Sequence, residues 1–134
     1  MTHPLVIFPD VVAETIDPLR TALAARPEAE VTGVEVHGRV PSPRPARLVV
    51  LRRDGGNADD VVTDRPRVTC QCWAATEVDA ERLAAITRAV LKTLPGTGAI
   101  RRVKDVGGPY PAPDPESDLP RYVFAVEITL RGDQ

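Results

Sequence analysis

Residues 76–96 read TEVDAERLAAITRAVLKTLPG and carry the pattern that most constrains the fold. Thr76 and Asp79 form a capping box at the start, and Pro95-Gly96 stops the helix that follows. The apolar side chains recur at helical spacing and form one stripe: Ala80, Leu83, Ile86, Val90 and Leu94. A helix with one apolar stripe must bury it, so the rest of the chain has to supply a second layer.

Alternating apolar residues predict strands on both sides of this helix. The clearest strand is 121–132, where one face carries five large side chains: Tyr122, Phe124, Val126, Ile128 and Leu130. In 67–74, Val68, Cys70 and Cys72 point one way and Trp73 the other. Residues 46–53 are apolar on both faces at their centre, which predicts an inner strand. Shorter strands are expected around Val34–Val36 and over 99–106.

A first helix is expected after Asp10, which can cap it. Val12, Ile16, Leu19 and Leu23 would form its stripe, and Pro18 predicts a kink or a restart. The resulting order is α-β-β-β-α-β-β. It predicts one α+β domain over residues 1–134, with a single mostly antiparallel or mixed sheet of about five strands packed with two helices. Two long loops are expected, 54–66 and 107–120.

Composition narrows the class of protein. The formal net charge is −2, which argues against a dedicated nucleic-acid binder because such proteins carry a basic excess. The first residues lack a basic signal-peptide region, and no stretch approaches the ~20 apolar residues of a membrane span. We therefore expect a protein that folds in the cytoplasm and has no membrane partner.

The sequence contains few candidates for metal-binding or catalytic residues. Cys70 and Cys72 could suggest a metal pair, but four ligands are needed and only two histidines are present, so two small core thiols are the favoured interpretation. Asp114, Glu116 and Asp118 could gather Ca²⁺ loosely, although a solvated loop fits the charge run better. No nucleophile elbow, phosphate loop or dinucleotide motif is found, and no enzyme activity or cofactor is expected.

Two segments are unusual for a small domain. VPSPRPARLVVLRRDGG (40–56) places three prolines before a strand, and we interpret it as a stiff docking edge that presents Arg44 and Arg47; the alternative is a connector whose prolines only block edge pairing. The hairpin segment 52–67 balances four cations against four anions, a composition suited to arginine–carboxylate pairs across a protein interface, or simply to a soluble loop. Its charged residues are Arg52, Arg53, Asp54, Asp59, Asp60, Asp64, Arg65 and Arg67.

Three segments taken in order, VPSPRPARLVVL, VTDRPRVTCQCWAATEVDAERLAAITRAVLKTLPG and PDPESDLPRYVFAVEITLRG, resemble the tail terminator proteins of long-tailed phages that infect actinobacteria. The resemblance covers roughly residues 8–132 and implies a non-enzymatic α/β subunit of a ring, usually a hexamer, in the neck of the virion. Such a ring caps the tail tube, stops its polymerisation and offers the surface to which the head connector attaches. Genomic DNA passes through it without specific binding.

The candidate contact residues for such a subunit come from both unusual segments and from the acidic loop. They are Arg44, Arg47, Arg52, Arg53, Asp59, Asp60, Asp64, Arg65, Arg67, Asp114, Glu116 and Asp118. Two alternatives stay open: another neck component, such as a head-completion or connector protein, and a small-molecule-binding α+β domain, which would need a concave site with convergent polar groups.

Overall fold

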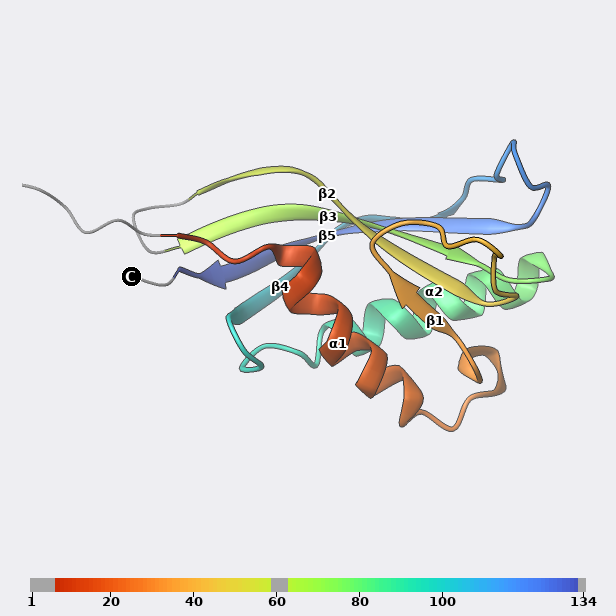
Figure 1. Ribbon diagram of the computed structural model, residues 1–134, viewed down its shortest axis with the longest axis horizontal. Coiled ribbons are helices and arrows are strands. Elements are labelled where there is room, and N and C mark those ends of the chain that lie inside the picture. The colour runs from red at the N-terminus through yellow and green to blue at the C-terminus, as the bar shows by residue number, and fades with distance from the viewer. Residues whose placement is uncertain (1–6, 59–62, 133–134) are drawn as a thin grey trace, which may run out of the picture.

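The computed structural model describes residues 7–58 and 63–132. Two helices, a short 3₁₀ turn and five strands follow one another along the chain (Figure 1). Their bounds are α1 Val11–Ala24, the 3₁₀ turn Ala29–Val31, β1 Glu35–His37, β2 Leu48–Ala58, β3 Thr63–Trp73, α2 Glu77–Leu91, β4 Ile100–Pro111 and β5 Arg121–Arg131. The predicted α+β class and the order α-β-β-β-α-β-β are confirmed.

The five strands form one mixed sheet in the order β1-β2-β3-β5-β4. Strand β1 pairs with β2 in parallel, and every other pair is antiparallel. Since β3 and β4 both run antiparallel to the β5 between them, helix α2 connects two parallel strands. The parallel β1–β2 pair requires a crossover, so the proline-rich residues 38–47 carry the chain from one end of β1 back to the start of β2.

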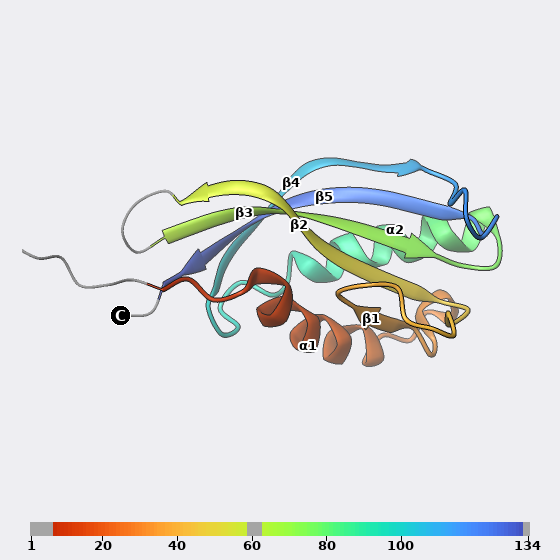
Figure 2. The ribbon, with the colours of Figure 1, turned by 45° about the horizontal axis from the view of Figure 1, so that its top comes forward.

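Both helices lie on the same side of the sheet, and the opposite face carries no helix (Figure 2). The core between the layers contains the α2 stripe and the predicted faces of β3 and β5, including Leu83, Cys70 and Phe124. The small, fully buried side chains on α2, such as Ala84, let the helix approach the sheet closely. No helix among the described residues is both long and apolar enough to span a membrane.

The strands are longer than predicted, which shortens both expected loops. Strand β2 continues to Ala58 and β3 begins at Thr63, so most of the segment predicted as the loop 54–66 is hairpin. Strand β4 continues to Pro111, so the loop predicted over 107–120 shrinks to 112–120. Glycine and proline in these stretches obscured the strand pattern. At Gly108, where φ is +84°, an added Cβ would lie 2.6 Å from the Val123 carbonyl oxygen, so the close approach of β4 to β5 needs glycine.

Helix α1 differs from its prediction in two ways. It runs without a restart through Pro18, and Asp10 caps it by accepting hydrogen bonds from the amides of Val12 and Ala13. The buried positions of its first half are Val11 and Thr15, so the predicted stripe is one residue out of phase there. The Thr15 hydroxyl donates to the Val11 carbonyl 2.6 Å away, which satisfies a polar group inside the core.

Candidate interaction surface

The uncovered face of the sheet carries a second, smaller apolar cluster at one end. Trp73, 1% exposed, packs there with Leu48 and Val50 from the neighbouring strand and with Leu119 from the loop 112–120. These side chains point away from the helices because each alternates with a core residue along its strand. The loop 112–120 therefore folds back over the uncovered face instead of extending into solvent.

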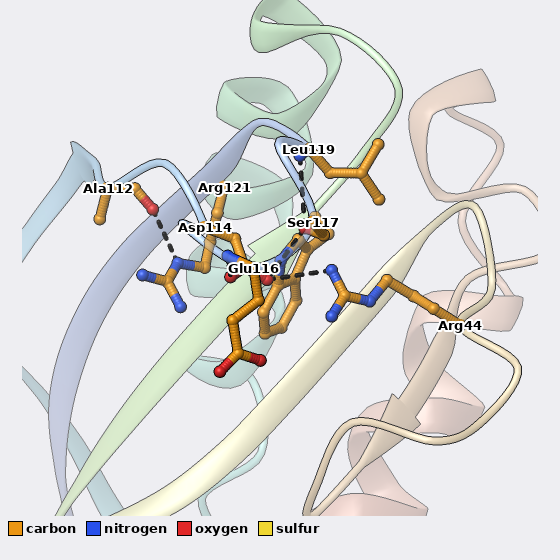
Figure 3. Close-up of polar contacts among 8 residues, drawn as sticks. Arg44, Ala112, Asp114, Glu116, Ser117, Leu119 and Arg121 are labelled. Atoms are coloured by element: carbon orange, nitrogen blue, oxygen red, sulfur yellow. Dashed lines mark hydrogen bonds and ion pairs between the residues drawn. The ribbon is translucent and has the colours of Figure 1, made fainter.

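Asp114 holds this loop in place through four hydrogen bonds (Figure 3). Its Oδ2 accepts from Arg44 Nη1 at 3.0 Å, from the Trp73 indole Nε1 at 3.1 Å and from Ser117 Oγ at 3.0 Å, while Oδ1 accepts from the Glu116 amide at 3.0 Å. We call these five residues the Asp114 cluster. It joins the crossover 38–47, the end of β3 and the loop 112–120 at one point.

Hydrogen bonding to the charged form explains the acidity of Asp114. The amide of Glu116 is the strongest cause, and Ser117, Trp73 and Arg44 add to it against the opposing effect of burial. Together they lower the pKa of Asp114 from its ordinary 3.8 to about 2. The carboxylate therefore stays ionised at all physiological pH values.

Arg44 is committed to this cluster. Its guanidinium lies 5.3 Å from the centroid of the Trp73 ring, in addition to its ion pair with Asp114, and the Arg121 guanidinium lies 5.6 Å from the same ring. This corrects the view of the proline segment as an arm that holds Arg44 outward. Arg47 likewise points back to the chain, with Nη1 donating to the Thr32 carbonyl at 2.6 Å.

The solvated loop expected over the three acidic residues is wrong for its first member. Asp114 is 7% exposed, whereas Glu116 and Asp118 are exposed. Within residues 7–58 and 63–132, no three His, Cys, Asp or Glu side chains gather closely enough to hold a metal ion. The bonds of Asp114 to four protein donors account for its position without a cation.

The hairpin charges that balance along the sequence are separated by the sheet. Asp64 lies on the helix side, 3% exposed, and pairs there with Arg53 at 3.3 Å. Arg52, Arg65 and Arg67 lie on the uncovered face, because their neighbours Leu51, Asp64 and Val68 are buried on the other one. Asp59 and Asp60 lie outside the described residues.

A basic face results at the end of the sheet opposite the Asp114 cluster. The register places further cations from β4 and β5 beside those of the hairpin, since Arg102 pairs with Thr129 and Lys104 with Glu127. We define the basic face as five exposed side chains: Arg52, Arg67, Arg102, Lys104 and Arg131. None of the five makes an ion pair with another described residue. Arg65 lies among them and pairs with Glu127 at 3.9 Å.

An acidic end lies beyond the other end of the sheet. Helix α2 starts there, and the loop 112–120 ends there, because the Ala74 amide donates to the Pro120 carbonyl. We define the acidic end as four exposed carboxylates at this end of the sheet, Glu77 and Glu81 on α2 at the helix side, and Glu116 and Asp118 in the loop over the uncovered face. The Tyr122 hydroxyl donates to Glu77 Oε1 at 3.4 Å. Burial, followed by the nearby charges of Glu77 and Glu81, raises the pKa of Tyr122.

The predicted location of the two cysteines in the core is confirmed. Cys70 and Cys72 are free thiols, fully buried on the helix side of β3. Burial raises the pKa of both thiols far above the ordinary value, so both stay protonated. A buried, protonated thiol is neither a nucleophile nor a ready metal ligand.

A comparison with protein-family models and a comparison with curated proteins both give no match. The surface must therefore be interpreted from its own chemistry. One hollow near the Asp114 end, about 490 Å³, is lined by residues that include Glu35, Arg47 and Asp79, but the Arg47 guanidinium is turned to a backbone carbonyl. The charged side chains that are left for a partner lie on open surface.

Sequence reasoning missed three members of this surface on β4 and β5. Arg102, Lys104 and Arg131 carry no local pattern that distinguishes them from ordinary solvent-facing residues. Only the pairing of β4 and β3 on either side of β5 brings them next to Arg67. The strand alternation gives their face, but the neighbouring strands could not be predicted from alternation alone.

Proposed function

We propose that this protein is a structural ring subunit of the tail terminator kind, which caps the head-proximal end of a phage tail tube and offers the surface for head attachment. The resemblance of three ordered segments to that family motivates the proposal. The observation that carries it is the uncovered face of the sheet, which bears five exposed cations with no ion pair inside the described chain. Exposed cations that form no ion pair within their own chain are available to bind a complementary, acidic surface of another protein.

The arrangement of charge also supports a ring. A closed ring uses heterologous contacts, in which one patch of a subunit meets a different patch of its neighbour. The basic face and the acidic end are two such different patches on one chain. A two-fold dimer would need both patches within one continuous interface, so that each meets the other across the axis.

The test is the growth of tail tubes. Purified protein added to polymerising tail tube protein, at amounts far below the tube protein, should stop elongation and give short tubes in electron micrographs. A Phe124→Asp variant places a charge in the core and is expected not to fold. It serves as the control for any nonspecific effect of adding protein to the assay. Tubes of unchanged length with the wild-type protein would contradict the proposal, and binding to the head connector without any effect on tubes would identify a head-completion protein.

A further inference from the structure

We propose that copies of this chain join head to tail through charge, with the basic face of one copy against the acidic end of the next. This inference rests on the proposed ring and names the contact that would build it. The seam would be polar, made by arginine–carboxylate pairs between surfaces that each copy carries once. The partner is therefore a second copy of this chain.

The basic face is suited to carboxylates. Four of its five cations are arginines, whose planar guanidinium groups bind carboxylates through two parallel hydrogen bonds. The register places these cations on diagonals, about 7–8 Å apart, or two strands apart, about 10 Å, with Glu127 between Arg67 and Lys104. The cations thus present several hydrogen-bond donors on one face of the sheet, where they outnumber the carboxylate of Glu127.

The acidic end offers the complement on rigid supports. Glu77 and Glu81 lie in the first turns of α2, one helical turn apart and on the same side. Glu116 and Asp118 lie in the loop that the Asp114 cluster fastens to the sheet. Ordering these carboxylates on assembly would therefore cost little conformational entropy.

The two patches cannot meet within one copy. Arg67, near the middle of β3, is paired with Glu127, whereas Trp73 at the last position of β3 is paired with Arg121 near the acidic end. That length of strand separates them by about 20 Å. Each copy therefore keeps one patch of each sign open, and successive copies continue until the ring closes.

The sheet edges are poor alternatives for the seam. Strand β4 is one edge, but its pairing with β5 shifts register at three places, and Pro109 and Pro111 have no N–H to donate to another strand. The other edge, β1, is three residues long. Irregular, charged and short edges of this kind resist pairing with another chain.

A nucleic acid fits the basic face less well than a second copy does. Glu127 lies in the middle of the cations, opposite both Arg67 and Lys104, where it would repel a phosphate backbone. The whole chain has a formal net charge of −2. The acidic complement, moreover, lies on the same molecule.

Two charge-reversed variants and their mixture test the seam. Arg52→Glu with Arg67→Glu makes the basic face acidic, and Glu81→Arg with Glu116→Arg makes the acidic end basic; all four side chains are exposed. Each variant alone should fail to assemble, with a dissociation constant raised at least about 100-fold. Their equimolar mixture should assemble like the wild type, in strict alternation, because every contact again joins opposite charges. The assembly state is measured by sedimentation velocity over a range of protein and salt concentrations.

Arg39→Glu is the control, since it reverses an exposed cation that forms no ion pair with another described residue and lies away from both patches. It should assemble like the wild type. The seam is wrong if the wild type stays monomeric at low salt, if either reversed variant assembles alone, or if the mixture does not. Salt-sensitive binding of duplex DNA that only the basic-face variant loses would instead assign the face to phosphates. A mixture that assembles but does not shorten tubes would leave the seam standing and refute the terminator function.

Discussion

At one end of the sheet Arg44 and Asp114 neutralise each other against a buried indole, whereas at the other end Arg67 and Lys104 face solvent and form no ion pair with another described residue. Both ends lie on the same uncovered face, and both are rich in arginine. The difference lies in burial. Charges at the Asp114 cluster had to be paired before they could leave water, while charges on the basic face stay hydrated and are available for another molecule.

The two ends thus have different roles: one stabilises the fold, and the other is available to bind another molecule. The Asp114 cluster fixes two segments that have no regular structure of their own, the crossover 38–47 and the loop 112–120. Substitutions there should reduce stability and affect assembly only indirectly. Substitutions on the basic face should do the reverse, and four measurements can break or sharpen this distinction.

The largest effect is expected for Asp114→Ala. The change leaves the buried indole N–H of Trp73 and the guanidinium of Arg44 without an acceptor, so the free energy of unfolding should fall by about 3 kcal/mol. Trp73 is the only tryptophan, and its fluorescence during urea unfolding reports on the cluster directly. Glu116→Gln, in the same loop with an exposed side chain, is the control and should change stability by less than about 0.5 kcal/mol.

Acid should weaken the same cluster in a defined window. Because the pKa of Asp114 is lowered from 3.8 to about 2 in the folded protein, its ionised form contributes stability above pH 4 that is lost as the pH falls to about 2. The contribution is about 2 kcal/mol. Asp114→Asn should unfold with a flatter pH dependence across that window than the wild type. If the free energy of unfolding varied with pH in the same way for the two proteins, the pKa of Asp114 would be the same in the folded and unfolded states.

A smaller loss is expected for Arg44→Ala, about 1–2 kcal/mol, since Asp114 keeps three other donors. Arg44→Lys should lie between the two, because lysine keeps the charge but not the planar stacking on Trp73. Arg39→Ala, an exposed arginine of the same crossover, should have no measurable effect. Equal stability of all three variants would return Arg44 to the outward-facing role expected from the sequence.

The contrast between the ends also explains what the sequence could predict. The capped helix α2, the buried faces of β3 and β5 and the inner position of β2 follow from local periodicity, which is a property of neighbouring residues. The Asp114 cluster does not follow from it. Arg44 and Asp114 are 70 positions apart, and they meet only because β1 and β2 pair in parallel and send the crossover to the loop.

The errors have physical causes of the same kind. Strand pairing extended β2, β3 and β4 through glycine and proline residues that mark turns in isolated sequence. Helix α1 continues through Pro18 because the burial of Leu19 and Leu23 in the core offsets the destabilising effect of proline inside a helix. The charges of residues 52–67 balance along the sequence but not on each face of the sheet, because strand alternation places Asp64 and Arg67 on opposite faces.

The smallest effect on stability is expected where the largest effect on assembly is proposed. Arg52→Ala with Arg67→Ala removes two cations that pair with no described residue, so the free energy of unfolding should change by less than about 0.5 kcal/mol. Any change should be a slight gain at low salt, since repulsion among the remaining cations of the face falls. The gain should vanish near 1 M salt, where the screening length is about 3 Å. A loss above about 1 kcal/mol would mean that these arginines already have partners within their own chain, and the two ends of the sheet would then not differ.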